Sequence, residues 1–118
     1  MAEQAPAPIL SIDIERYAGD MAIVRCHGQL VAGSTHILYS QVDALMPEIQ
    51  RVVLDLSDLR YTDSMGLGCL VRLYVTARAA GCTLELFNLS QQIRNLLGMT
   101  NVLNVLPVIS EAALDLGE

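Results

Sequence analysis

Apolar and polar positions alternate near the start of the chain. The opening segment, residues 1–8 (MAEQAPAP), is rich in alanine and proline and predicts a disordered tail. From Leu10 to Glu15 apolar residues fall at every second position, and the same period of two returns from Met21 to Leu30. Because Gly19 lies in the short turn between these segments, we expect them to form a β-hairpin.

Helical spacing replaces this alternation after Gly33. Ser34 is a candidate N-cap, and the apolar residues that follow recur at intervals of three and four up to Pro47. Residues 52–56 then form an almost continuous apolar run, which is typical of a strand in the middle of a parallel sheet. The apolar residues of this first predicted helix are Leu38, Val42, Leu45 and Met46.

A second helix and strand follow in the middle of the chain. A polar link over residues 57–63 leads into a helix that closes at Gly81, and residues 82–87 predict the next strand. The apolar stripe predicted for this helix consists of Leu67, Leu70, Val71, Tyr74 and Ala77.

The last part of the chain repeats the succession once more. Ser90 is placed to cap a short helix that ends at Gly98, and residues 105–109 predict a final strand. Pro107 has no backbone N–H, which indicates that this strand lies at a sheet edge. Residues 110–116 predict one or two further helical turns.

The predicted order is β-β-α-β-α-β-α-β-α, without internal repeats. It predicts an α/β fold with a small, mixed and mainly parallel sheet and right-handed crossovers. The 118 residues suit a single domain over residues 9–118, and a hydrophobic content of 53% is enough for a core. Since no apolar stretch reaches the roughly 18 to 20 residues of a membrane span and no signal peptide is recognisable, we expect a cytoplasmic protein that does not bind membranes.

Composition and motifs argue against several classes of function. The net charge is −6, there is no lysine, and the seven arginines are scattered, so we expect no nucleic-acid partner. The three cysteines lack C-x-x-C spacing, which predicts buried reduced thiols rather than disulfides or a metal site. No phosphate-binding glycine motif follows a strand, and Thr62 replaces the first glycine of a G-x-S-x-G nucleophile elbow. We therefore expect neither an enzyme nor a bound cofactor.

The segment from Tyr61 to Gly68 (YTDSMGLG) is the most unusual in the chain, because a polar loop leads directly into an apolar helix. Ser64 lies at the helix start, where free N–H groups and the helix dipole favour anionic oxygen such as that of a phosphate. Gly66 and Gly68 lower helix propensity, which suits a surface that another backbone approaches closely. From local spacing alone, the alternative is that Ser64 merely caps the helix and the glycines fit a tight turn.

These residues resemble the STAS family, and in particular its bacterial anti-sigma factor antagonists. The resemblance rests on residues 52–57 (VVLDLS), 62–68 (TDSMGLG) and 28–30 (GQL), and it extends over roughly residues 9–116. In such proteins the serine of the D-S-x-G-L-G motif is phosphorylated by a serine kinase that is also the anti-sigma factor. The resemblance implies phosphorylation at Ser64, with Thr62 as second candidate, and a phosphoprotein phosphatase as a further partner. It also implies that the unphosphorylated protein binds the kinase and frees the sigma factor.

A partner surface is expected around Ser64. Asp63 has two candidate roles, in helix-start electrostatics and in orienting the Ser64 hydroxyl, whereas Asp55 in its apolar strand is expected to be structural. On a helical wheel, the side of the middle helix opposite Leu67 and Val71 is free for a partner. The expected partner-binding residues are Gln29, Val31, Gly33, Ser34, Asp63, Ser64, Met65, Gly66, Gly68 and Arg72.

Three departures from the family pattern concern the partner rather than the fold. The family often has acidic residues where this chain has Gln29 and Val31, and Met65 replaces the second serine of the motif. A second interpretation therefore stays open, namely a STAS interaction or ligand-sensing module of a signalling complex. It would use the same surface, near residues 28–33 and 64–68, but Ser64 would only cap its helix.

Overall fold

The structure, a computed structural model, describes residues 8–46, 48–110 and 114. Apart from Pro8, Ser110 and Leu114, the predicted tail and the predicted final helix lie outside the described residues. The elements in chain order are β1 (Leu10–Tyr17), β2 (Met21–Leu30), α1 (Thr35–Leu45), β3 (Arg51–Thr62), α2 (Ser64–Ala79), β4 (Thr83–Phe87), α3 (Gln91–Met99), the 3-10 turn η1 (Val102–Asn104) and β5 (Val108–Ile109).

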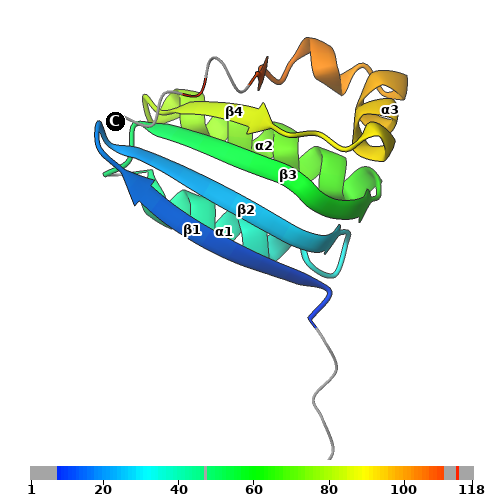
Figure 1. The fold of residues 1–118 in the computed structure, drawn as a ribbon. Helices are drawn as coiled ribbons and strands as arrows, with labels where there is room; N and C mark the ends of the chain where they lie inside the picture. The colour runs from blue at the N-terminus through cyan, green and yellow to red at the C-terminus, as the bar shows by residue number, and fades with distance from the viewer. Residues whose placement is uncertain (1–7, 47, 111–113, 115–118) are drawn as a thin grey trace, which may run out of the picture.

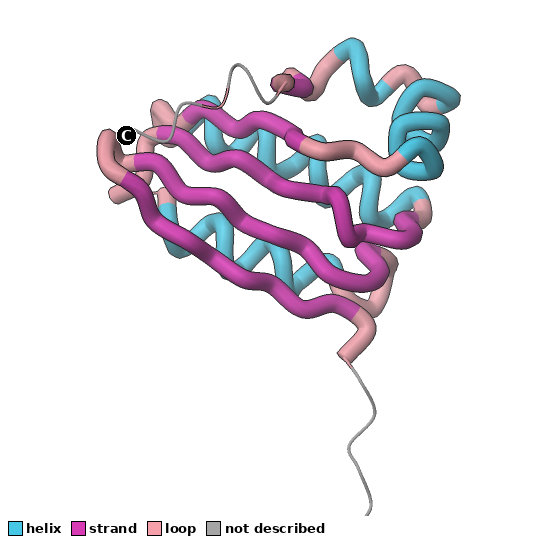
Figure 2. Tube along the Cα trace, in the orientation of Figure 1, coloured by secondary structure: helices cyan, strands magenta, loops and turns pink. Residues whose placement is uncertain are grey.

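One five-stranded sheet in the order β1-β2-β3-β4-β5 organises the fold. β1 and β2 form the predicted antiparallel hairpin, and every other pair of neighbours is parallel. α1 and α2 lie on one face of the sheet, and α3 lies beyond the end of β4 (Figures 1 and 2). The predicted mainly parallel α/β fold is therefore confirmed, and β5 lies at the sheet edge as Pro107 indicated.

The main core fills the space between the sheet and these two helices. Val24 of β2 and Leu54 of β3 are fully buried there, and burying such a side chain contributes roughly 1.5–3 kcal/mol. The four apolar residues predicted for the first helix are all buried. The buried residues of α2 are Gly66, Leu67, Cys69, Leu70, Leu73 and Ala77, whereas the predicted Val71 and Tyr74 are half-buried at its margin.

The prediction of a polar link over residues 57–63 is wrong, because β3 continues to Thr62. Its second half pairs with the last residues of β2, after register shifts between Arg25 and His27 and between Gly28 and Gln29. Composition alone suggested a loop, but a neighbouring strand supplies the backbone hydrogen bonds that hold these polar residues in an extended conformation. The extension runs beside the end of β2 and leads to the start of α2.

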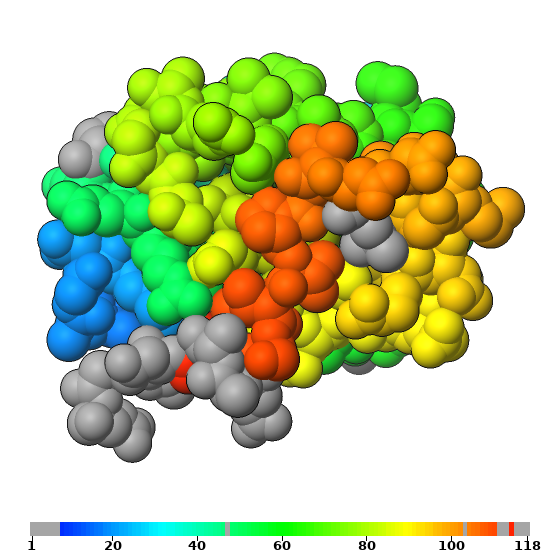
Figure 3. Space-filling model, turned by 90° about the horizontal axis from the view of Figure 1, so that it is seen from above, coloured from blue at the N-terminus to red at the C-terminus, as the bar shows by residue number. Residues whose placement is uncertain are grey.

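The last predicted strand is shorter than expected and comprises only β5, Val108–Ile109. η1 precedes it, with the N–H groups of Val105 and Leu106 donating to the carbonyl of Val102. Figure 3 shows this orange segment running beside the yellow-green end of α2. It borders an open groove of about 520 Å³ lined by Tyr74, Arg94 and residues 104–108.

Candidate functional site

The polar segment around Ser64 lies where β3 ends and α2 begins. Asp63 has an extended backbone (φ −104°, ψ −173°), and its carboxylate accepts a hydrogen bond from the N–H of Gly66 at 2.9 Å. Asp63 is therefore the N-cap of α2, and the alternative in which Ser64 caps this helix is wrong. Ser64 is the first residue of the helix and is exposed.

Asp63 also connects α2 to the loop before α1, since its carboxylate accepts a second hydrogen bond from the N–H of Ala32 at 3.1 Å. These donors stabilise the charged carboxylate and lower the pKa of Asp63 from its ordinary 3.8, with the Gly66 N–H as main cause and that of Ala32 adding to it against the effect of burial. Of the two roles predicted for Asp63, the one at the helix start is confirmed. Among the described residues no hydrogen bond joins it to the Ser64 hydroxyl.

The two candidate phosphoacceptors have opposite environments. Thr62 is 2% exposed, and its hydroxyl donates to the carbonyl of Leu30 at 2.7 Å. Ser64 is exposed, and its hydroxyl makes no hydrogen bond within the part of the chain that the structure describes. In the folded chain, the Ser64 side chain is therefore open to solvent, whereas that of Thr62 is not.

The two glycines of the motif also differ. Gly66 is buried, and a Cβ built on it would lie 2.1 Å from both the Leu30 carbonyl oxygen and the Thr62 hydroxyl oxygen. The close backbone approach that its presence suggested is thus internal, and the prediction that Gly66 contacts a partner is wrong. Gly68 is exposed, and a Cβ there would meet no atom within 4 Å.

The loop between β2 and α1 lies beside the start of α2 through the contact of Ala32 with Asp63. Ser34 in this loop is fully buried, and its hydroxyl donates to the Gln29 carbonyl at 2.8 Å and accepts from the Val31 N–H at 3.0 Å. Ser34 is the N-cap residue of α1, as predicted, although its side chain makes no capping bond to the helix. Its full burial contradicts the prediction that it contacts a partner. The residues that remain at least partly exposed define the Ser64 surface: Gln29, Val31, Gly33, Asp63, Ser64, Met65, Gly68 and Arg72.

A shallow pocket of about 120 Å³ lies within this surface. The Arg72 guanidinium lies 4.4 Å from the centre of the Tyr39 ring, and the Tyr39 hydroxyl is hydrogen-bonded to that of Thr76 at 2.8 Å. Burial raises the pKa of the Cys69 thiol in the pocket to about 11, so Cys69 is protonated at neutral pH and is a poor nucleophile. The pocket is lined by Thr35, Ser64, Met65, Gly68, Cys69 and Arg72.

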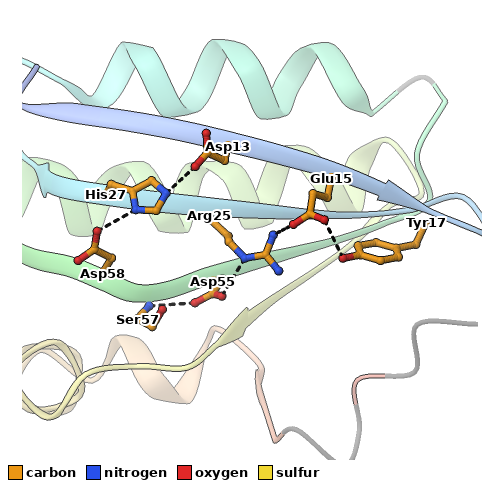
Figure 4. A network of polar contacts seen from close by, with 8 residues as sticks. All are labelled: Asp13, Glu15, Tyr17, Arg25, His27, Asp55, Ser57 and Asp58. Atoms are coloured by element: carbon orange, nitrogen blue, oxygen red, sulfur yellow. Dashed lines mark hydrogen bonds and ion pairs between the residues drawn. The ribbon is translucent and has the colours of Figure 1, made fainter.

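A polar network that was not predicted from the sequence lies on the sheet face away from α1 and α2 (Figure 4). His27 of β2 lies between Asp13 of β1 and Asp58 of β3, with a ring nitrogen 2.8 Å from each carboxylate. The pKa of His27 is raised above its ordinary 6.5, mainly by the hydrogen bond to Asp58; burial opposes this rise, and the contacts with Asp13 add to it. The alternating polar residues were a signal for this face, but the pairing depends on strand register.

A second part of the network surrounds Arg25, which contacts Glu15 and lies 3.5 Å from the carboxylate of Asp55. Asp55 is 6% exposed and also accepts a hydrogen bond from the N–H of Ser57 at 3.0 Å. These contacts supply the partners that a buried carboxylate requires, in agreement with the structural role predicted for Asp55.

Within residues 8–46, 48–110 and 114, no group of three His, Cys, Asp or Glu side chains is arranged to hold a metal ion. No helix of the described chain combines the length and apolar character that crossing a bilayer requires. The three cysteines are buried, as predicted, and are not joined to one another.

The pattern of a known family covers most of the chain, because the STAS domain profile matches residues 11–113. The chain belongs to the STAS domain family. An anti-sigma F factor antagonist from Paenibacillus polymyxa is 26% identical over 101 residues, which cover 84% of this chain and 86% of that protein.

Solved structures share the fold of this STAS chain. An anti-sigma factor antagonist from Mycobacterium paratuberculosis is 19% identical, with a TM-score of 0.75 over 88% of this chain and 89% of that one. The antagonist SpoIIAA in its unphosphorylated form is 14% identical, with a TM-score of 0.71 over 86% of this chain and 90% of that one. SpoIIAA in its phosphorylated form, described as a Bacillus cell fate determinant, has a TM-score of 0.66 at 14% identity over 86% and 94% of the two chains.

Proposed function

We propose that this STAS chain is an anti-sigma factor antagonist that binds a serine-kinase anti-sigma factor and is switched off by phosphorylation of Ser64. The observation that carries the proposal is the exposed hydroxyl at the first residue of α2, beside a cap that Asp63 supplies. Since Asp63 does the capping, the Ser64 hydroxyl has no structural contact among the described residues and is available to a kinase. The name of the Paenibacillus polymyxa relative supports this class of partner.

The chemical step transfers the γ-phosphoryl group of ATP to the Ser64 oxygen, with loss of the hydroxyl proton and release of ADP. The kinase supplies the catalytic groups, and this chain is its substrate. The product carries about −1.5 to −2 charges at neutral pH at the first residue of α2, where the helix dipole tolerates an anion. The scaffold therefore accepts the phosphate at little cost.

The phosphate acts on the interface through its charge. It stands next to the ionised Asp63 on a chain whose net charge is already −6. Like charges placed across a protein contact cost several kcal/mol, and about 1.4 kcal/mol corresponds to a tenfold change in affinity. One phosphate is therefore enough to release a partner of micromolar affinity.

Release requires no refolding, because Ser64 contributes neither to the core nor to the cap. The similarity of this chain to both forms of SpoIIAA supports a fold that persists through modification. We further propose that a phosphoprotein phosphatase removes the phosphate by hydrolysis and returns the chain to its binding form. The kinase, which is also the anti-sigma factor, and the phosphatase both meet the chain at the Ser64 surface.

The test combines the chain with ATP and a serine-kinase anti-sigma factor from the same genome. We expect one phosphate on Ser64 by mass spectrometry, and a loss of affinity of at least about tenfold by titration calorimetry. Ser64→Ala should abolish incorporation, whereas Ser11→Ala, at another exposed serine, should not. Phosphate at another residue, or equal affinities of the modified and unmodified chains, would remove the proposal and favour a STAS interaction or ligand-sensing module.

A further inference from the structure

Three residues of the Ser64 surface form a row along α2. Ser64, Gly68 and Arg72 follow one another at intervals of four residues, and all three line the shallow pocket. Residues four apart lie one above another on the same side of a helix. Since Gly68 has no side chain and its surroundings are open to 4 Å, no side chain within the row separates Ser64 from Arg72.

Arg72 is the one charged residue among those that line the pocket. Its guanidinium lies over the Tyr39 ring, and among the described residues no carboxylate lies within ion-pair distance of it. Long side chains on a helix lean towards the helix N-terminus, which for Arg72 is the direction of Ser64. Arg72 is thus an exposed cation without a counter-ion in the described chain, and it lines the same pocket as the residue that gains the phosphate.

We propose that Arg72 is the internal ligand of the phosphate at Ser64. The proposal rests on the function proposed above and adds how the chain itself responds to modification. The guanidinium offers paired N–H donors that match phosphate oxygens, and it moves from the Tyr39 ring to the phosphate. Phosphorylation therefore both adds negative charge to the Ser64 surface and withdraws the cation of its pocket from the partner.

The pKa of the phosphate measures this contact directly. Phosphoserine is incorporated at position 64 during synthesis of the full chain, and its phosphorus-31 chemical shift is followed from pH 4 to 8. A neighbouring cation favours the dianion, so we expect the second pKa of the phosphate to be lower by about half a unit or more in the unsubstituted chain than in the Arg72→Gln variant. Equal values in these two chains would overturn the proposal.

Arg78→Gln is the matched control. Arg78 lies on the same helix, and its guanidinium also lies over a tyrosine ring, 5.8 Å from the centre of Tyr74. The substitution removes the same charge at a distance from the pocket, so we expect the phosphate pKa to stay as in the unsubstituted chain. A shift equal to that of Arg72→Gln would show a general charge effect and overturn the proposal.

Arg72→Lys provides a second variant in case Arg72→Gln does not fold, which far-ultraviolet circular dichroism and urea unfolding detect. Lysine keeps the charge but loses the paired donors, so the phosphate pKa should lie above that of the unsubstituted chain and below that of a serine-phosphorylated peptide of residues 61–68. A value equal to that of the peptide would contradict the proposed contact.

Coupling to the partner gives an independent measurement. The double-mutant cycle combines phosphorylation of Ser64 with the substitution Arg72→Gln. In each chain the loss of affinity for the anti-sigma factor on phosphorylation is measured. This loss should be at least about fivefold smaller in Arg72→Gln than in the unsubstituted chain, since the variant has no cation to withdraw. Equal reductions would count against a role of Arg72 in release. The phosphorus titration uses neither kinase nor partner, so failure of the kinase to modify Ser64 removes the proposed function and leaves the Arg72 contact testable.

Discussion

Gly66 and Gly68 stand two residues apart in α2, and replacing each with alanine should have opposite effects on stability. At Gly66 the new Cβ would lie 2.1 Å from the Leu30 carbonyl oxygen and the Thr62 hydroxyl oxygen. Because one of these atoms belongs to the backbone of β2, a rotamer change cannot relieve the overlap. At Gly68 the new Cβ meets nothing within 4 Å.

The magnitudes follow from these contacts. Overpacking costs about 1–3 kcal/mol, and disturbing the 2.7 Å hydrogen bond from Thr62 to Leu30 adds about 0.5–1.5 kcal/mol. The better helix propensity of alanine offsets up to about 1 kcal/mol. We therefore expect Gly66→Ala to lower the free energy of unfolding by about 0.5–3.5 kcal/mol, and Gly68→Ala to raise it by up to about 1 kcal/mol.

Urea unfolding followed by circular dichroism at 222 nm measures both variants. With an unchanged slope, Gly66→Ala should lower the urea midpoint by about 1 M, and Gly68→Ala should leave it equal or slightly higher. Two variants of equal stability would refute the internal role of Gly66 and reopen a role in partner contact. A loss of kinase binding in Gly66→Ala without loss of stability would have the same meaning.

Further predictions concern titration and thiol access. The raised pKa of His27 means that its contacts with Asp13 and Asp58 stabilise the fold fully below pH 6.5, the ordinary value, and lose this effect as pH rises through the higher folded-state pKa. The urea midpoint of the unsubstituted chain should therefore exceed that of His27→Gln by an amount that declines above pH 6.5. A difference between the two midpoints that stays constant with pH would contradict this prediction. Because the pKa of Asp63 is lowered, its charged carboxylate stabilises the fold above pH 3.8, and this effect is lost as pH falls through the lower folded-state pKa. Asp63→Ala should therefore have a lower urea midpoint than the unsubstituted chain at pH 6, and the two midpoints should converge in acid. The three buried thiols should react with a disulfide reagent at pH 8 only slowly until urea is added, and rapid labelling of the folded chain would disprove their burial.

The sequence was sufficient for the elements whose signal is local. Period-two alternation predicted the hairpin, helical spacing predicted the buried side of α1, and Ser90 caps α3 by accepting from the N–H of Ile93 as predicted. The D-S-x-G-L-G motif pointed to Ser64, and the structure places that residue on the surface at the start of α2. These features depend on side chains a few residues apart, so the chain alone contains the information.

Contacts between distant segments decided the rest. The sequence suggested an exposed site that includes Ser34, Thr62 and Gly66. In the structure, carbonyls at the end of β2 accept the hydrogen bonds of the two hydroxyls, and one of these carbonyls lies directly against Gly66. The extension of β3 and the pairing of His27 with two strands likewise depend on register across the sheet. The packing of β2, β3, α1 and α2 therefore decides which hydroxyl, which glycine and which arginine face solvent. Burial and hydrogen bonding between remote residues have no local signature in the sequence.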